Sequence, residues 1–197
     1  MFKADKIHKE KVIEILSECF ETNKSVNWIV KQDEKRKERI RYLMEYSFEA
    51  CVEIGQVYLT DNVSGVIIYS NSDDKLPILK EAFLTVQYVW KVTGVDGIGR
   101  ALRREQYVNQ FHPTDQEFLY IWFIGLKKTE QGKGLGSAML HEVIDKSNKE
   151  QIPIYVETSN ERSLNFYSKH GFEVYHTSPD DLFGFKLYFM RKLPVEE

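Results

Sequence analysis

The sequence predicts a single α/β domain in which a mixed central sheet is flanked by helices, with extra helices inserted before the central strand. Two observations predict this class. Segments with helical and strand-like patterns follow one another in the order ααββααβαβαββ. Within that order, an apolar run at 118–126 leads through a glycine-rich turn into a helical pattern. The chain has 197 residues, of which 42% are hydrophobic, and this is enough for one sizeable core.

The N-terminal half is predicted to be mainly helical. In several segments apolar side chains recur every three or four residues, a spacing that places them on one face of a helix. Two shorter segments are rich in β-branched and aromatic residues, and Asp61-Asn62 between them is typical of a hairpin turn. We therefore expect helices over 6–20, 31–54, 76–92 and 98–111, strands over 56–60 and 63–70, and a break over 23–30.

The C-terminal half is predicted to alternate strands with helices. The apolar run before the glycines has the composition of a strand that is buried on both faces. Thr158 and Glu161 have the spacing of a capping box, Asn160 can cap the same helix, and Gly171 suits the left-handed position after its end. We expect strands over 118–126, 152–157, 172–177 and 183–193, helices from 135 onward and over 158–170, and a turn over 178–181.

Composition argues against several classes of protein. The formal net charge is −3, so no overall basic field favours nucleic acid. No apolar run approaches the length of a membrane span, and Met1 is not followed by the apolar segment of a signal peptide. Cys19 and Cys51 have neither the spacing of metal ligands nor that of a disulfide framework. We expect a cytoplasmic protein with no metal and with neither nucleic acid nor membrane as a partner.

The turn at 131–136 reads Gln-Gly-Lys-Gly-Leu-Gly and comes immediately before a helix. The first turn of a helix has unpaired N–H groups and a partly positive end, and glycines allow an anion to approach them closely. Neither standard phosphate motif fits. Lys127 stands where a P-loop needs its first glycine, and a dinucleotide fingerprint would need a third glycine at Ser137 or Met139. The turn is predicted to bind an anion, and the alternative is a glycine-rich turn without a ligand.

What the turn does match is the pattern Gln/Arg-x-x-Gly-x-Gly/Ala after a strand, through Gln131, Gly134 and Gly136. Here the sequence resembles the GNAT superfamily of N-acetyltransferases. A second matching stretch lies downstream at the spacing found in that family, Asn160-x-x-Ser163-x-x-Phe166-Tyr167-x-x-x-Gly171-Phe172.

The resemblance implies an acetyl-CoA site. In the family, the turn binds the pyrophosphate, the strand before it offers backbone groups to the cosubstrate, and the asparagine contacts the pantetheine arm. A glycine within that strand, Gly125, also indicates a bulge or the close approach of a ligand. The alternative for Asn160 is a helix cap alone. The implied acetyl-CoA-binding residues are Phe123, Ile124, Gly125, Leu126, Gln131, Gly132, Lys133, Gly134, Leu135, Gly136, Ser137, Asn160, Ser163 and Phe166.

Three residues are candidates for catalysis. The resemblance implies that Tyr167 protonates the departing thiolate, and the alternative is a core tyrosine with a solvated tip. Glu157 ends a predicted strand, where it could act as general base or orient the acceptor; the alternative is a solvated carboxylate at the rim. His112 belongs to the residue type whose ordinary pKa lies nearest neutrality, and the alternative is a surface histidine in the turn before Pro113.

The predicted function is direct transfer of an acetyl group from acetyl-CoA to an amine of a small molecule or to an exposed peptide or protein amine. The alternative is a non-catalytic CoA-binding sensor or interaction module with the same fold. Within one domain, 1–197, we expect residues 113–193 to form the acetyl-CoA-binding core and residues 1–112 to form the acceptor side. The aromatic residues of the inserted helices would line an acceptor pocket or simply pack in the core, and a homodimer is one assembly that we consider.

Overall fold

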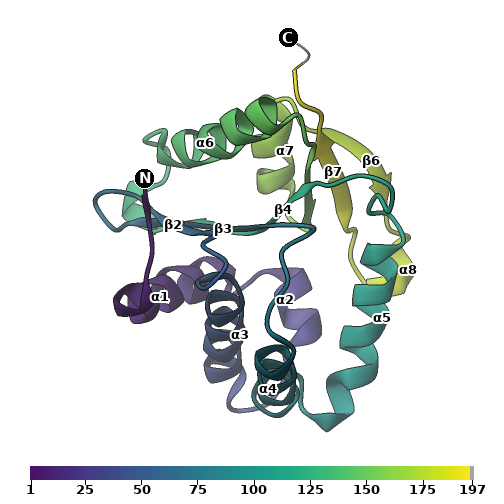
Figure 1. Ribbon diagram of the computed structural model, residues 1–197. Helices are drawn as coiled ribbons and strands as arrows, with labels where there is room; N and C mark the ends of the chain where they lie inside the picture. Colours follow the sequence, from purple (N-terminus) through teal and green to yellow (C-terminus); the bar gives the residue numbers. More distant parts are fainter. Residues whose placement is uncertain (196–197) are drawn as a thin grey trace.

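A seven-stranded sheet runs through the computed structural model, which describes residues 1–195 (Figure 1). The strands lie in the order β1-β2-β3-β4-β5-β7-β6. Every neighbouring pair is antiparallel except β4 and β5, which are parallel. The strands are β1 Phe2–Lys3, β2 Val57–Leu59, β3 Gly65–Asn71, β4 Leu119–Leu126, β5 Ile154–Thr158, β6 Glu173–Thr177 and β7 Tyr188–Lys192.

Helices cover both faces of this sheet. Helices α6 and α7 lie on one face, whereas α1, α3 and α4 lie on the other, with α5 beside the edge formed by β6 and β7 (Figure 1). The helices are α1 Lys9–Phe20, α2 Lys24–Ile29, α3 Arg36–Cys51, α4 Ile78–Tyr88, α5 Ile98–Asn109, α6 Leu135–Glu150, α7 Glu161–Lys169 and α8 Asp180–Phe183. Short 3-10 turns lie at Lys6–His8, Val95–Gly97 and Lys128–Glu130, and a π-helix lies at Val89–Thr93.

The alternation of side chains along β4 divides the core into two layers. Leu119 and Ile121 are buried in the layer under α6 and α7, together with Met139 of α6. Trp122 packs instead against the other layer, where α1 and α3 bury residues such as Leu16 and Phe48. Such alternation follows from the period of two along a strand. The predicted α/β class, with its mixed sheet and flanking helices, is therefore confirmed.

The inserted helices were expected and are present between β3 and β4. The pattern predicted over 76–92 is divided between α4 and the π-helix that continues it. Tyr107 of α5 and Phe111, just beyond the end of that helix, pack with Phe189 of β7. By contrast, Phe83 and Trp90 are 63% and 70% exposed, so part of the aromatic content of this segment lies outside the core.

Three short elements contradict the predictions made for their positions. The break expected over 23–30 contains α2, which begins where the Asn23 side chain accepts a hydrogen bond from the N–H of Val26. The turn expected over 178–181 leads into α8, and β1 was not predicted at all. Elements of two to six residues are too short to show a helical or strand period, so only their caps can signal them.

Of the two alternatives predicted for Gly125, a bulge or the close approach of a ligand, the structure rules out the bulge. The ladder between β3 and β4 shifts register at Ile68/Tyr69, so that Trp122 is the extra residue, whereas Gly125 pairs regularly with Val66. A Cβ atom on Gly125 would lie 3.0 Å from Cδ2 of Leu16 and 3.1 Å from Sγ of Cys19. Helix α1 therefore approaches Gly125 closely, and the approach of a ligand to its backbone stays a prediction.

No helix in residues 1–195 combines the length and the apolar character needed to cross a membrane.

Candidate active site

The parallel strands β4 and β5 pair only at their beginnings. Their register joins Leu119 to Ile154 and Tyr120 to Tyr155. Beyond these pairs, β4 continues to Leu126 and β5 to Thr158 with no further pairing between them in the part of the chain that the structure describes. Backbone groups along the second half of β4 are therefore left without a strand partner on this side. The predicted residues Phe123 to Leu126 lie on this unpaired half. Four residues of β4, Trp122, Phe123, Ile124 and Leu126, are only partly buried, so the strand is not buried on both faces along its whole length as predicted.

The glycine-rich turn has open space in front of it. Gly132 and Gly134 have φ of +81° and +84°, and a Cβ atom on either would meet nothing within 4 Å. Helix α6 starts at Leu135 without a side-chain cap, and Ala138 is the residue whose N–H bonds back to the carbonyl of Gly134. The N–H groups of residues 135–137 thus precede the first bond of this helix. A left-handed, open turn with unpaired N–H groups fits an anionic phosphate.

Two polar side chains of the turn differ in what they contact. Gln131 donates a hydrogen bond from Nε2 to the carbonyl of Leu126 at 3.1 Å, which holds the turn against the end of β4. Lys133 pairs with Glu130 at 3.0 Å, and its side chain is 58% exposed. Gly136 faces inward, because its Cβ position lies 3.2 Å from Leu126 and 3.7 Å from Phe166.

Asn160 caps α7, and whether it also contacts the cosubstrate stays a prediction. Its Oδ1 accepts a hydrogen bond from the N–H of Arg162 at 2.8 Å. The expected capping box from Thr158 is not formed, because the Thr158 hydroxyl accepts a hydrogen bond from the N–H of Asn160 itself. The amide nitrogen Nδ2 of Asn160 has no partner in residues 1–195, so the cap leaves this donor available. Ser163 and Phe166 follow on the same helix and are half-buried.

Tyr167 lies on the inner face of α7 with only 4% of its surface exposed. Its ring packs against those of Phe166 and Phe172, at centroid distances of 5.4 and 5.3 Å. Burial, followed by the negative charge of Glu157, raises the pKa of Tyr167 above its ordinary value. The hydroxyl, which has no hydrogen-bond partner in the described chain, therefore keeps its proton at neutral pH.

Three side chains meet at the end of β5. Nε2 of His112 lies 2.9 Å from Oε1 of Glu157, and the Tyr120 hydroxyl donates to Oε2 at 2.5 Å. The side chain of Glu157 is 1% exposed and that of His112 is 12% exposed. These positions exclude the solvated rim carboxylate and the surface turn histidine. Because an ionised carboxylate only accepts hydrogen bonds, the Nε2 of His112 carries the proton that faces it.

Tyr120 was not singled out from the sequence. Burial and the charge of Glu157 raise its pKa, with the positive charge of Arg104 acting in the opposite direction, so that Tyr120 remains a donor. Its position follows from register. Tyr120 pairs with Tyr155, and Glu157 lies two residues further along β5, on the same face. Only this pairing identifies Tyr120 as a neighbour of Glu157.

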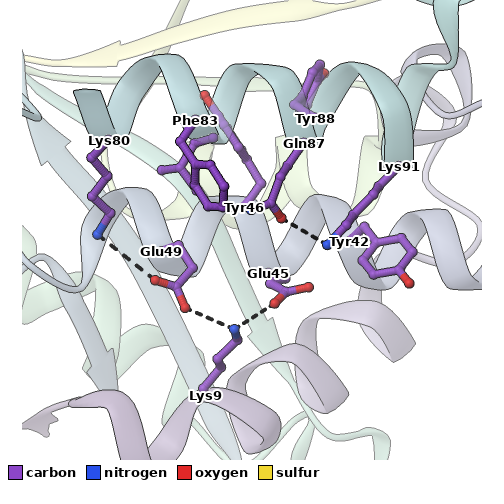
Figure 2. Close-up of a pocket in the computed structure, with 11 residues that line it drawn as sticks. Lys9, Tyr42, Glu45, Tyr46, Glu49, Lys80, Phe83, Gln87, Tyr88 and Lys91 are labelled. Carbon is purple, nitrogen blue, oxygen red and sulfur yellow. Dashed lines mark hydrogen bonds and ion pairs between the residues drawn. The ribbon is translucent and has the colours of Figure 1, made fainter. Parts of the chain in front are cut away.

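A separate pocket of about 240 Å³ lies between α3 and α4 (Figure 2). Lys9 reaches into it and pairs with Glu45 and Glu49 at 2.6 and 2.9 Å. Lys91 donates to Gln87 at 2.9 Å. None of the predicted acetyl-CoA-binding or catalytic residues lines this pocket, although Phe83 and Tyr88, two aromatic residues of the inserted segment, do, and its charged groups are largely paired with one another. The candidate site is therefore the region of β4, β5, α6 and α7.

Comparison with known proteins bears on the family of the chain. The model of the acetyltransferase (GNAT) family matches residues 9–172. An uncharacterized N-acetyltransferase of Schizosaccharomyces pombe is 25% identical over 162 residues, which are 74% of this chain and 62% of that protein. N-alpha-acetyltransferase 50 of Danio rerio is 32% identical over 89 residues, 43% of this chain and 49% of that protein. The matches thus span between about half and less than two thirds of these relatives.

A solved structure resembles the whole fold. The crystal structure of a histone acetyltransferase HPA2 and related acetyltransferase from Corynebacterium glutamicum superimposes with a TM-score of 0.72 and 19% identity. The alignment covers 100% of this chain and 96% of that one. At this identity the likeness establishes the fold, and the family match over most of the chain establishes the relationship. The chain belongs to the acetyltransferase (GNAT) family.

Proposed function

We propose that this protein transfers an acetyl group from acetyl-CoA to the amine of an acceptor. The observation that carries the proposal is the early end of pairing between β4 and β5. It connects the open glycine turn at the start of α6 with the buried cluster of His112, Glu157 and Tyr120. The glycine turn thus suits the phosphates of the cosubstrate, and the buried cluster holds groups that can accept and deliver protons.

Acetyl-CoA would be held mainly by backbone groups. The N–H groups of residues 135–137, with the open positions at Gly132 and Gly134, would bind its pyrophosphate. The unpaired half of β4 and Nδ2 of Asn160 would bind the pantetheine arm, with Ser163 and Phe166 alongside. We assign this role to residues 113–193 and the acceptor side to residues 1–112, within one domain.

Two proton transfers accompany the reaction, and each can be given to a named residue. Acetyl-CoA provides a thioester; transfer forms a C–N bond to the acceptor, breaks the C–S bond, and requires one proton to leave the amine and one to reach the sulfur. His112 would take the proton from the amine at Nδ1, since its Nε2–H is held by Glu157. Glu157 would orient His112 and stabilise its cation, as a buried carboxylate does beside a catalytic histidine. Tyr167 would supply the proton to the sulfur.

Nitrogen is the proposed accepting atom. The two curated relatives and the structural neighbour carry names of N-acetyltransferases or of a histone acetyltransferase, and these names support an amine acceptor here. The site itself supports it too, because an amine bound as its ammonium ion needs a base before it can attack.

The test combines cosubstrate binding with turnover. Calorimetric titration with acetyl-CoA should show binding, and thiol release should follow when amines are added. Tyr167→Phe should lower kcat by a factor of about 10² to 10⁴ while leaving acetyl-CoA affinity nearly unchanged. Tyr42→Phe is the control, because the Tyr42 hydroxyl bonds Glu38 on the surface of α3. Tight binding without turnover on any amine would instead indicate a CoA-binding sensor.

A further inference from the structure

One face of α5 points toward the catalytic cluster. Tyr107 and Val108 lie on this face, where Val108 is 5% exposed and the Tyr107 hydroxyl lies 2.9 Å from Nε2 of His176. Phe111 continues the same face beyond the helix, and His112 follows it and reaches Glu157. Arg104 lies one turn before Tyr107 and Val108 on this face, since residues three and four apart are neighbours on a helix.

Arg104 is tied to the end of β5 through two hydrogen bonds. Its Nε donates to Oγ of Ser25 at 3.0 Å. Ser25 is 8% exposed, and its N–H donates to Oγ of Ser159 at 3.3 Å. Ser159 lies two residues beyond Glu157. Arg104 is thereby fixed between α5, α2 and the strand that carries the catalytic carboxylate. The opposing effect of its charge on the pKa of Tyr120 is consistent with this position.

The guanidinium of Arg104 lacks a counter-ion. No carboxylate in residues 1–195 lies within ion-pair distance of it, and Nη1 and Nη2 have no hydrogen-bond partner there. Arg39, by comparison, makes two bonds to Asp33 at 2.9 and 2.7 Å. The two Nη atoms are not among the buried polar atoms that lack a partner in residues 1–195, so they are accessible to solvent and to a ligand. The Nε bond fixes the group and leaves the two Nη nitrogens as a pair of parallel donors.

A second donor near α5 is also without an acceptor. Trp28 lies one turn after Ser25 on α2, and its ring packs on Phe183, which Tyr107 also contacts. The indole nitrogen of Trp28 is buried and has no partner in the described chain. Donors without acceptors therefore gather where α2 and α5 meet, and such a region suits a ligand that brings acceptor atoms.

We propose that Arg104 binds a carboxylate of the acceptor, so that the substrate is a small molecule carrying both an amine and a carboxylate, as an amino acid does. This inference rests on the proposed acetyl transfer. A guanidinium with two free parallel donors matches the two oxygens of a carboxylate. One cation neutralises one carboxylate, whereas a phosphate with nearly two charges would call for a second cation. The amine of such an acceptor would extend from Arg104 toward His112.

The first test compares acceptors that differ only in the carboxylate. The series is phenylalanine, phenylalaninamide and phenethylamine, with leucine and leucinamide as a second pair, and phosphoethanolamine as the phosphate probe. Wild-type protein should give the highest kcat/KM with the free amino acids. Arg104→Gln should lower that value by a factor of ten or more and change the rates with the amides less than threefold, and Arg104→Lys should recover part of the loss. Arg103→Gln is the matched control, because Arg103 is exposed on the same helix.

Three results would overturn the inference while leaving acetyl transfer intact: equal or higher rates with the amides, equal losses for both classes in Arg104→Gln, or a preference for phosphoethanolamine. A second measurement does not require turnover. N-acetylphenylalanine and its amide are titrated into the wild type and both glutamine variants in the presence of CoA. Tighter binding of the acid than of the amide, lost only in Arg104→Gln, would support the carboxylate site even if no amine were acetylated. In that case the proposed acetyl transfer would be refuted and the carboxylate site would not. Equal binding of acid and amide would refute the inference.

Discussion

His112 and Glu157 are 45 residues apart in the sequence, yet Nε2 of His112 lies 2.9 Å from Oε1 of Glu157. His112 comes from the segment after the inserted helices, and Glu157 comes from β5. The contact therefore exists only because β5 pairs in parallel with β4 and because α5 runs along the edge of the sheet. It joins the two regions that we assign to the acceptor and to acetyl-CoA.

Replacing Glu157 by glutamine should remove the negative charge beside His112 while keeping the volume of the side chain. An amide can accept one hydrogen bond, but it does not stabilise a histidine cation and can favour the wrong tautomer of His112. We expect kcat to fall by a factor of about 10² to 10⁴, with acetyl-CoA affinity changed less than about threefold. Steady-state thiol release together with calorimetric titration measures both quantities.

The matched control for this substitution is Glu117→Gln, since Glu117 is an exposed carboxylate shortly before β4. It should retain wild-type rates. If Glu157→Gln kept more than half of the wild-type kcat, the pair of His112 and Glu157 would not be the base, and the amine would have to lose its proton to another group or to water.

Gly134→Asp should remove acetyl-CoA binding. The position has open space in front of the helix, so the aspartate would occupy the place assigned to the pyrophosphate and repel it. We expect the dissociation constant to rise by about 100-fold or more, that is by at least 2.7 kcal/mol of binding free energy. Calorimetric titration gives this value directly.

Backbone strain must be separated from charge in that experiment. Gly184→Asp is suitable, because Gly184 has a φ of +73° and nothing within 4 Å of its Cβ position, but it follows α8 and not the turn before α6. Both variants should lose a similar free energy of unfolding, about 1 kcal/mol. Equal affinity in the two variants would show that the phosphates do not bind at the turn.

The turn before α6 and helix α7 could be predicted from the sequence because their signals are local. Glycines at fixed offsets, a cap at Asn160 and a repeat of apolar residues all lie within about ten residues of the element that they specify. The contacts of Glu157 are different in kind. They depend on the register of β4 and β5 and on the path of α5, and neither leaves a period in the sequence. Tyr120 was therefore indistinguishable from the other aromatic residues of its strand.

Gly125 illustrates a limit of the same origin. A glycine within a strand signals a close neighbour, but the sequence does not say which neighbour. The prediction offered a bulge or a ligand, whereas the neighbour that the structure places against the Cβ position is α1. Phe83 of α4 and Trp90 of the π-helix that follows show a second limit. Their spacing is helical whether the face they form is covered or open, so the sequence does not reveal that both are exposed.

Alkaline pH should reveal the burial of Cys51. The thiol is 1% exposed, and burial, with a smaller effect of Asp74, raises its pKa to about 12 from 9.0. Because the pKa of the thiol is higher in the folded state, its contribution to the free energy of unfolding is complete below pH 9. This contribution is lost as pH rises toward 12, at about 1.4 kcal/mol per pH unit. The free energy of unfolding of the wild type should therefore fall relative to Cys51→Ala above pH 9. Urea denaturation between pH 7 and 11 measures this difference.

Ser47→Ala is the control for Cys51→Ala, since Ser47 is equally buried one turn earlier on α3 and does not titrate in this range. Its stability should follow the wild-type curve at a constant offset. Parallel curves for Cys51→Ala and the wild type up to pH 11 would mean that the thiolate is not excluded from the core.

Gly125→Ala should destabilise the protein through α1. The added methyl group would lie 3.0 Å from Leu16 Cδ2 and 3.1 Å from Cys19 Sγ, so that the helix must move away from β4. Overpacking of this kind lowers the free energy of unfolding by about 1–3 kcal/mol. Gly99→Ala, at a helical position with nothing within 4 Å, should instead raise the free energy of unfolding by about 0.5–1 kcal/mol.

A double-mutant cycle identifies the cause. In a Cys19→Ala background, where the sulfur is absent, Gly125→Ala should cost at least about 0.5 kcal/mol less. Urea denaturation of the four proteins gives the coupling. A coupling near zero, together with an unchanged stability in Gly125→Ala, would show that α1 does not require glycine at this position.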